Sequence, residues 1–391
     1  MNHLKQGKRE LDARRRAIFC LLFFALSCIE DASPAVKKIG SKRLLAAARA
    51  GGDYLIRVQK PDGSFHYFYD PLEDRFSARA YNMVRHAGTA LSLFDLYKAT
   101  RDARYLDAAN RAVNFLKTRF RPARESDAAY VLDNDGKAKL GANGLALLAL
   151  ARQAELDPKS ADRENAAKLA NLIILMQRKD GSFESYYRIR GDEAHGSVSL
   201  YYPGEAILGL VELFRLTGDK RLLDSARRGA EYLIESQRSM GSLPADAWLM
   251  QALEALFKVE RRPKYAEHTI ALAEAMIAEQ YTENDSPLYA GGFRPGPPRA
   301  TPAASRAEGM VAAYRLARSM KDARASKIAS ALKASVRFQI SQQFDKNNGL
   351  SLPAPDKAAG GFRQSISSTR IRIDFVQHNI SSLVGVADAL Y

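Results

Sequence analysis

Two kinds of predicted helix alternate along most of the chain. In the first kind, apolar residues form one stripe: within 102–120, Tyr105, Ala109 and Val113 recur at helical spacing, and charged residues lie opposite them. The second kind is apolar on nearly every face and rich in glycine and alanine, as in GANGLALLALA at 141–151. A helix that is apolar all round is expected to be buried. The first kind should therefore lie outside and the second inside.

Six helices of each kind are predicted, in strict alternation. The outer helices are expected at 42–59, 102–120, 162–177, 220–236, 263–279 and 322–342. The inner helices are expected at 83–97, 141–151, 203–214, 245–257, 302–317 and 375–391. Six outer–inner pairs predict an all-α fold, an (α/α)6 toroid of one domain over residues 41–391, in which the first outer helix packs beside the last inner helix.

A short motif repeats where outer helices end. The pattern Q-x-x-D-G-S-F occurs at 59–65 and again at 177–183, and a degraded copy begins at Gln237. These positions indicate a unit of about 60 residues, with one intervening unit in which the motif has eroded. The motif resembles the repeat of terpenoid cyclases, and the six hairpins resemble the six-hairpin glycosidase group. The chain has no Asp-Asp pair of the kind that terpenoid cyclases use, so we do not expect cyclase chemistry.

The connections between helices differ on the two faces of the predicted toroid. Links from an inner helix to the next outer helix are short, at 100–103, 217–220 and 260–263. Links from an outer to an inner helix are long, at 60–81, 121–140, 178–202 and 343–373. Long loops on a rigid scaffold commonly carry function, and the inner helices begin on that same face. We therefore expect the functional site there, at the mouth of a central cavity.

Residues 1–28 have the pattern of a targeting segment. Basic residues precede the apolar run AIFCLLFFALSC, which is too short to span a bilayer comfortably and ends in a small-x-small cleavage site. We expect a signal peptide or a lipoprotein signal with a lipid on Cys28, an uncleaved anchor being the alternative. The protein would be periplasmic or secreted, with membrane contact only through this segment or that lipid. Cys20 and Cys28 both lie here, so the domain itself has no cysteine chemistry.

The chain is basic, with 59 Lys+Arg against 44 Asp+Glu and a net charge of +15. This balance fits an anionic substrate or surface, but no nucleic-acid-binding motif accompanies it. No Walker loop, G-x-S-x-G elbow, dinucleotide fingerprint or H-E-x-x-H motif is present, so we expect no cofactor and no metal. DNDG at 133–136 lacks the later ligands of a calcium loop and predicts an Asx-rich turn. A carbohydrate, possibly acidic, is the expected partner.

Two glutamates near the starts of inner helices are candidate catalytic groups. Glu205 follows Tyr-Tyr-Pro-Gly, and either complements the helix dipole or acts as an acid or base beside Tyr202. Glu308 lies about two turns inside its helix, which is too deep for capping. It is expected either to pair with a basic residue such as Arg306 or to take part in catalysis.

The first and last inner helices also begin with polar residues. The last begins RIDFVQHN (372–379), in which Asp374 has capping-box spacing to Gln377, whereas His378 is not explained by a cap. The first begins YNMVRH (81–86). Ring closure would make these helices neighbours, so His86 and His378 are expected to border one pocket, with buried structural hydrogen bonds as the alternative.

These candidates define three functional hypotheses. The first is a glycoside hydrolase with Glu205 and Glu308 as its two carboxylates and Asp374 and Asp246 in reserve. The second is a uronate-polymer lyase or epimerase in which Tyr or His moves a proton, and the third is a non-catalytic glycan-binding or assembly protein. The expected catalytic residues are Glu205, Glu308, Asp374, His86 and His378. The expected substrate-binding residues are Tyr81, Asn82, Arg85, Tyr202, Asp246, Trp248, Arg363, Arg372 and Asn379.

Overall fold

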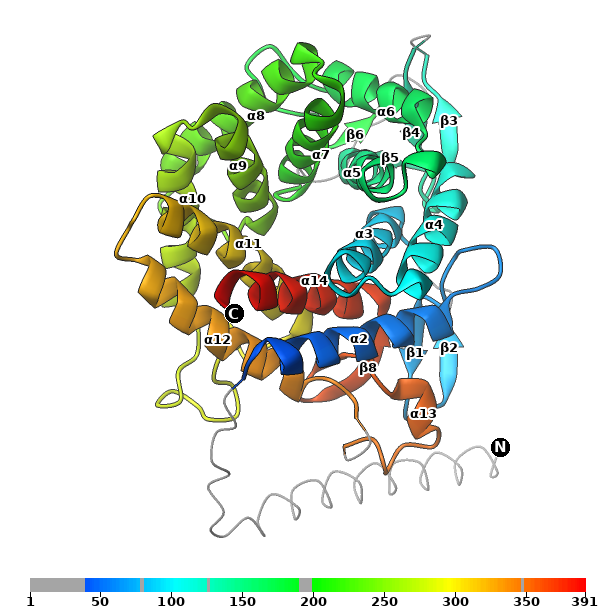
Figure 1. Cartoon of the computed structure of the whole chain (residues 1–391), viewed down its shortest axis with the longest axis vertical. Helices are drawn as coiled ribbons and strands as arrows, with labels where there is room; N and C mark the ends of the chain where they lie inside the picture. Colours follow the sequence, from blue (N-terminus) through cyan, green and yellow to red (C-terminus); the bar gives the residue numbers. More distant parts are fainter. Residues whose placement is uncertain (1–38, 78–80, 125–126, 190–198, 346–347) are drawn as a thin grey trace, which may run out of the picture. The chain divides into compact units, whose positions relative to one another are not determined.

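Two concentric rings of helices make up the described part of the chain (Figure 1). The structure, a computed structural model, describes residues 39–391 except 78–80, 125–126, 190–198 and 346–347. The outer ring comprises α2 (Ser41–Val58), α4 (Ala103–Lys117), α6 (Arg163–Leu175), α8 (Lys220–Arg238), α10 (Pro263–Ala278) and α12 (Ala325–Ser341). The inner ring comprises α3 (Met83–Thr100), α5 (Leu140–Leu156), α7 (Tyr202–Thr217), α9 (Ala247–Glu260), α11 (Ala300–Ser319) and α14 (Ile373–Leu390).

The last inner helix closes the ring. Helix α14 packs against α2, α3 and α11, and the contact of α2 with α14 is visible in Figure 1. The predicted (α/α)6 toroid with its closing contact is therefore confirmed. The predicted targeting segment, 1–28, lies outside the described residues. Among the helices that are described, none combines the length and apolar character needed to cross a membrane.

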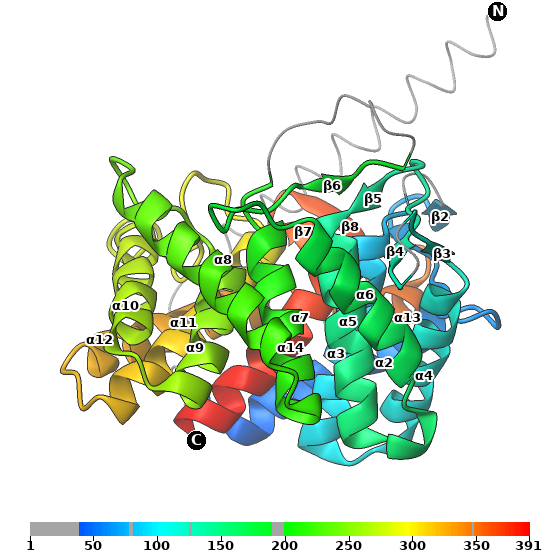
Figure 2. The ribbon, with the colours of Figure 1, turned by 90° about the horizontal axis from the view of Figure 1, so that it is seen from above.

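Short strands lie in the long loops, on one face of the ring (Figure 2). Four of them form an antiparallel sheet of order β2-β1-β8-β7, in which Phe68 lies opposite Arg372. Its strands are β1 (Phe68–Asp70), β2 (Arg75–Ser77), β7 (Arg363–Ser365) and β8 (Ser368–Arg372). The two smaller sheets pair β3 (Phe120–Pro122) with β4 (Ala129–Val131) and β5 (Ala138–Lys139) with β6 (Tyr186–Tyr187). The four-stranded sheet thus joins the first long loop to the last.

The repeated sequence motif is a turn that fastens one outer helix to the next. Gln59 Nε2 donates to the carbonyl of Gly63, at 3.3 Å, and to that of Ala108 in α4, at 2.9 Å. The φ of Gly63 is +88°, and a Cβ there would lie 2.1 Å from the carbonyl oxygen of Arg111. Only glycine fits both requirements. The equivalent turn at Gln177 bonds Gly181 and α8.

Two further copies of this turn have longer insertions and no D-G-S-F sequence. Gln280 donates to the carbonyls of Gly291 and Ala331, both at 3.1 Å. Gln343 donates to Gly360, at 3.0 Å, and to Ala47 in α2, at 2.8 Å, which closes the outer ring. The degraded copy predicted at Gln237 makes no such turn, because its amide bonds Asp246 and its carbonyl oxygen bonds His268.

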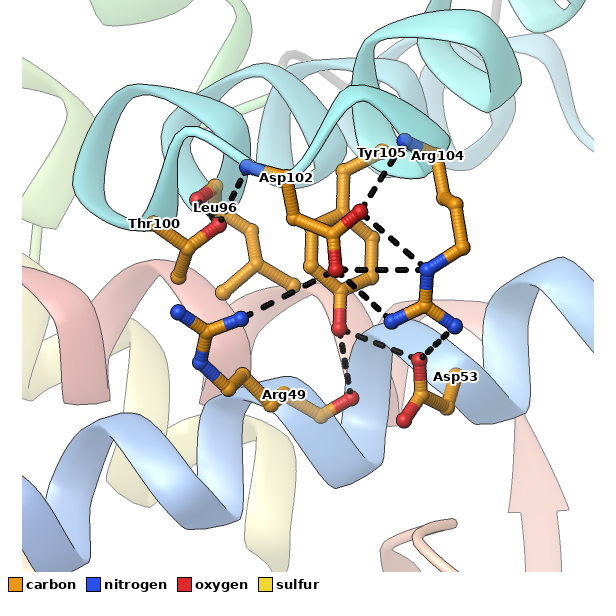
Figure 3. Close-up of polar contacts among 7 residues, drawn as sticks. All are labelled: Arg49, Asp53, Leu96, Thr100, Asp102, Arg104 and Tyr105. Carbon is orange, nitrogen blue, oxygen red and sulfur yellow. Dashed lines mark hydrogen bonds and ion pairs between the residues drawn. The ribbon is translucent and has the colours of Figure 1, made fainter.

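The short links on the opposite face have a different fastening (Figure 3). Asp102 caps α4 by accepting from the backbone N–H of Arg104, at 3.1 Å, and also binds its guanidinium group. Arg104 and the Tyr105 hydroxyl both reach Asp53 of α2, at 3.3 and 3.0 Å. The same Asp-x-Arg cap begins α8, with Asp219 and Arg221, and recurs before α12, with Asp322 and Arg324.

Candidate active site

A cavity of about 650 Å³ lies at the starts of the inner helices, on the face that carries the long loops. All six inner helices contribute to its wall, as do the loops that precede α7 and α11. It brings together seven residues that the sequence suggested: Asn82, Arg85, Tyr202, Glu205, Trp248, Asp374 and His378. We call it the front cavity.

Glu205 is a buried carboxyl group in the first turn of α7. Only 3% of the residue is exposed, and its Oε2 has no hydrogen-bond partner among the described residues. Burial raises the pKa of Glu205 to about 8; a positive charge on His378 opposes this rise, and Asp246 adds to it. Glu205 therefore holds its proton at neutral pH and can donate it to a group bound in the cavity.

A close contact with α5 positions Glu205 and Tyr202. A Cβ at Gly141 would lie 2.2 Å from Oε2 of Glu205 and 2.3 Å from Cδ1 of Tyr202, so no larger residue fits there. Burial also raises the pKa of Tyr202 to about 12, with the Glu205 charge as a second cause. Gly141, the first glycine of the G-A-N-G sequence in α5, thus leaves space for the carboxyl group of Glu205 and the phenol ring of Tyr202.

Glu308 and His378 form a buried pair on the neighbouring helices α11 and α14. The Nδ1 atom of His378 lies 3.0 Å from Oε1 of Glu308. Burial lowers the pKa of His378, but Glu308 and the more distant Asp374 and Glu205 outweigh this effect, and the pKa is raised overall. No described residue bonds Nε2, and the His378 side chain is 13% exposed. Nε2 can therefore exchange a proton with a ligand.

A second cavity, of about 350 Å³, lies behind this pair, and we call it the rear cavity. It shares Trp248, Gln377 and His378 with the front cavity, and the ring of Trp248 meets that of His378 edge-on at 6.3 Å. Glu308 lines only the second cavity. The structure therefore places Glu308 behind His378 and not in the wall of the front cavity, where the two-carboxylate hypothesis needed it.

Asp374 lines the front cavity, but its oxygens are held by arginines. Arg85 approaches at 3.2 Å and Arg372 at 2.8 Å. Arg85 also donates to the hydroxyl of Tyr67, at 2.7 Å. The bond between Arg85 and Asp374 joins α3 to α14, the two helices that ring closure was predicted to make neighbours. Arg372 itself does not line the cavity, because its guanidinium group lies over the ring of Phe375, at 4.6 Å, and binds Asp374.

His86 and Tyr81 do not reach the cavity, contrary to the prediction. His86 is fully buried, with its Nδ1 2.7 Å from the Tyr81 hydroxyl and its Nε2 2.8 Å from the carbonyl of Ala112 in α4. Burial lowers the pKa of His86 to about 4. Successive residues of a helix point about 100° apart. Since Arg85 faces the cavity, His86 faces the outer ring.

Three other predicted site residues make structural hydrogen bonds instead of lining the cavity. Asp246 is buried and caps α9, accepting from the N–H of Leu249 at 3.0 Å, and burial raises its pKa to about 7. Asn379 is buried and donates to a carbonyl of its own helix, at 2.6 Å. Arg363 donates to the carbonyl of Ser341, at 3.2 Å. None of the three lines the front cavity.

The loop before α11 supplies cavity residues that we did not predict. Phe293, Arg294 and Arg299 line the front cavity, together with Tyr201 from the start of α7. The sequence did carry a signal for these residues, because 280–299 is another long link from an outer to an inner helix, and we expected the site on such links. Among the described residues, no group of three or more His, Cys, Asp or Glu side chains is placed to hold a metal ion.

No protein-family model and no curated protein matches this sequence. Solved structures do share its fold at low sequence identity. An inactive variant of an α-1,6-mannanase from Salegentibacter sp. HEL1_6, in complex with α-1,6-mannotriose, is 12% identical with a TM-score of 0.64, covering 88% of this chain and 99% of its own. Cellobiose 2-epimerase from Bacillus thermoamylovorans B4167 is 13% identical with a TM-score of 0.67, covering 89% and 99%.

A third similar structure is an unsaturated glucuronyl hydrolase specific for heparin. It is 14% identical, with a TM-score of 0.64, and the match covers 89% of this chain and 98% of that enzyme. Identities this low establish the fold and not the activity. The terpenoid-cyclase likeness of the repeated turn stays a sequence observation. The chain has the (α/α)6 toroid fold that these solved structures share.

Proposed function

We propose that this protein is a carbohydrate-active enzyme that hydrolyses glycosidic bonds in the front cavity. The observation that carries the proposal is Glu205, a buried carboxyl group of a cavity-lining residue whose Oε2 has no hydrogen-bond partner among the described residues and whose pKa burial raises to about 8. Trp248, Tyr201 and Tyr202 line the same space and suit the apolar faces of a sugar. The mannanase and the glucuronyl hydrolase with this fold support a glycan substrate.

We propose one glutamate and one histidine for the two proton-transfer roles, in place of the two carboxylates that the sequence suggested. Glu205 donates its proton to the leaving oxygen as the bond from that oxygen to the anomeric carbon breaks. His378 Nε2 takes a proton from the water that attacks the anomeric carbon. Glu308, bonded to Nδ1, orients the ring and stabilises the imidazolium that forms. Exchange with solvent then returns both groups to their starting states.

An epimerase or isomerase is the second candidate, and the His378–Glu308 pair favours it. A histidine that can remove and return a proton is suited to a carbon atom beside a carbonyl group. The fold likeness to cellobiose 2-epimerase supports this reading. The predicted Tyr81 and His86 cannot serve it, because they bond each other away from the cavity.

One assay separates these activities. The protein is incubated with a panel of neutral and acidic oligosaccharides in D2O, and the products are followed by mass spectrometry. Hydrolysis yields shorter chains with new reducing ends, whereas epimerisation conserves the chain length and introduces deuterium at carbon. Glu205→Gln should abolish hydrolysis, and Glu164→Gln, on the exposed face of α6, is the matched control. If the protein binds these oligosaccharides without converting them, both enzymatic proposals are wrong and the non-catalytic glycan-binding hypothesis stands.

We also propose that the protein is exported, periplasmic or secreted, through residues 1–28. The support is the basic segment followed by AIFCLLFFALSC. Mass spectrometry of the protein purified from each cell fraction tests this proposal. A mature chain that begins at Cys28 with a lipid mass indicates a lipoprotein, and Cys28→Ser should then release it from the membrane fraction. An intact N-terminus in the cytoplasmic fraction contradicts export.

A further inference from the structure

Two arginines in the wall of the front cavity have no carboxylate partner in the described part of the chain. Arg299 lies at the N-cap of α11 and Arg306 two turns further on. The other two arginines of this wall are paired, Arg85 with Asp374, at 3.2 Å, and Arg294 with another carboxylate, at 2.9 Å. Unpaired positive charge therefore gathers at the start of α11.

The surroundings of Arg306 leave its charge poorly compensated. Its guanidinium group lies over the ring of Phe293, at 4.9 Å, and its Nε is buried with no hydrogen-bond partner among the described residues. Burial lowers the pKa of Arg306; Tyr201 and Glu279 act against this, and the positive charge of Arg299 lowers it further. Glu279 forms no ion pair with it. Two neighbouring like charges, one of them partly desolvated, favour a bound anion.

The position of these arginines adds further donors. Helix α11 has 20 residues, and the positive dipole end at its start attracts negative charge. The hydroxyl of Thr301 in its first turn is buried and has no partner among the described residues. It lines the same cavity. Two guanidinium groups, a hydroxyl and a helix N-terminus thus share one part of the wall.

We propose that Arg299, Arg306 and Thr301 form a subsite for an acidic group of the substrate. This inference rests on the proposed function, and it names the substrate class as an acidic glycan carrying a uronate carboxylate or a sulfate ester. A guanidinium fork binds either group through two parallel hydrogen bonds. Phe293 fixes the plane of the Arg306 fork, and Arg299 is the more exposed of the two arginines.

The test measures anion binding directly, on the full chain and at low salt. Calorimetry and thermal shift are recorded with inorganic sulfate, glucuronate, glucose 6-sulfate and, as the neutral match, glucose. At least one of the anions should bind saturably, with an affinity at least tenfold above that of glucose. Arg306→Gln and Arg299→Gln should each weaken this binding by tenfold or more without changing the affinity for glucose. Tighter binding of glucuronate or of glucose 6-sulfate identifies the acidic group.

The control is Arg318→Gln, an exposed arginine near the end of the same helix. It should leave the anion affinity unchanged. No saturable anion binding by the wild type, or an equal loss of anion and glucose affinity in Arg306→Gln and Arg299→Gln, would overturn the subsite. Binding needs no turnover, so the two proposals fail separately. Hydrolysis without anion preference contradicts the subsite alone, and anion binding without hydrolysis contradicts the proposed activity alone.

Discussion

Nδ1 of His378 lies 3.0 Å from Oε1 of Glu308, and this contact joins two neighbouring inner helices between the front and rear cavities. A carboxylate on Nδ1 fixes the orientation of an imidazole ring and leaves Nε2 for proton transfer. In the proposed mechanism, Glu308 acts through His378 and not as a second carboxylate beside the substrate. Each of the first two predictions below tests one part of this arrangement.

Replacing His378 by glutamine should remove proton transfer while keeping a hydrogen-bonding side chain. We expect turnover to fall roughly 100-fold or more, the usual scale for the loss of a general base, with little change in melting temperature. The matched control is His86→Gln, because His86 is buried in structural hydrogen bonds. That variant should melt earlier and keep its turnover per folded molecule. The reverse pattern would make His378 the structural histidine.

Replacing Glu308 by glutamine should move the acid limb of the pH–rate profile. Burial alone lowers the pKa of His378, and the Glu308 charge is the largest of the causes that raise it. The variant loses that charge, so the pKa of His378 falls and the unprotonated base persists to lower pH. We expect the limb to move to lower pH. Glu212→Gln, in the rear cavity, is the control. An unmoved limb would separate Glu308 from the chemistry.

Glu205 should make the stability of the protein depend on pH. An ordinary glutamate loses its proton near 4.5, whereas folded Glu205 keeps it to about 8. Between these values the folded state binds more protons, so the free energy of unfolding falls as the pH rises, by on the order of 5 kcal/mol. Glu205→Gln removes this fall.

Denaturant unfolding of the wild type and Glu205→Gln checks the sign of this effect. The two proteins should be equally stable below pH 4.5, and the variant should gain an increasing advantage up to about pH 8, where it levels off. A constant difference across this range would mean that Glu205 is ionised in the folded protein. The same titration predicts that catalysis declines above about pH 8, because the acid has lost its proton.

The architecture could be predicted from the sequence because it depends on periodic patterns. A helix such as α5, buried along nearly all its length, differs in composition from the one-sided α4, and this contrast orders the rings. The short strands were missed because each has only two to five residues. The turns at Gln280 and Gln343 were missed because insertions separate the glutamine from its glycine.

The candidate site was only partly predictable, because a residue's direction depends on the rotation of its helix. Position along the chain placed Arg85 and His86 together, but one faces the cavity and the other faces α4. The same rotation from one residue to the next lets His378 line the front cavity and turns Asn379 into the protein interior. Partners far apart in sequence, such as Glu308 and His378, leave no local pattern at all. The direction of a single side chain on its helix, and the pairing of residues far apart in the sequence, can therefore be established only from the structure.

The last prediction concerns the space that Gly141 leaves for the acid. An alanine Cβ at this position would lie 2.2 Å from Oε2 of Glu205 and 2.3 Å from Tyr202, so both side chains must move. The matched control is Gly385→Ala in α14, where the nearest atoms lie 3.6 Å away, an ordinary contact. Because alanine favours helix over glycine by about 1 kcal/mol, Gly385→Ala should be neutral or stabilising and fully active.

Gly141→Ala should therefore lose most of its turnover while remaining folded. A displacement of about 1 Å in a catalytic group costs on the order of 100-fold in rate. Circular dichroism and melting temperature establish that the helices persist, and steady-state kinetics measures the loss. The gain in helix propensity partly offsets the strain, so we expect a smaller effect on stability than on rate. Full activity in Gly141→Ala would show that the chemistry does not depend on the position of Glu205, and the acid would then have to be another group in the front cavity.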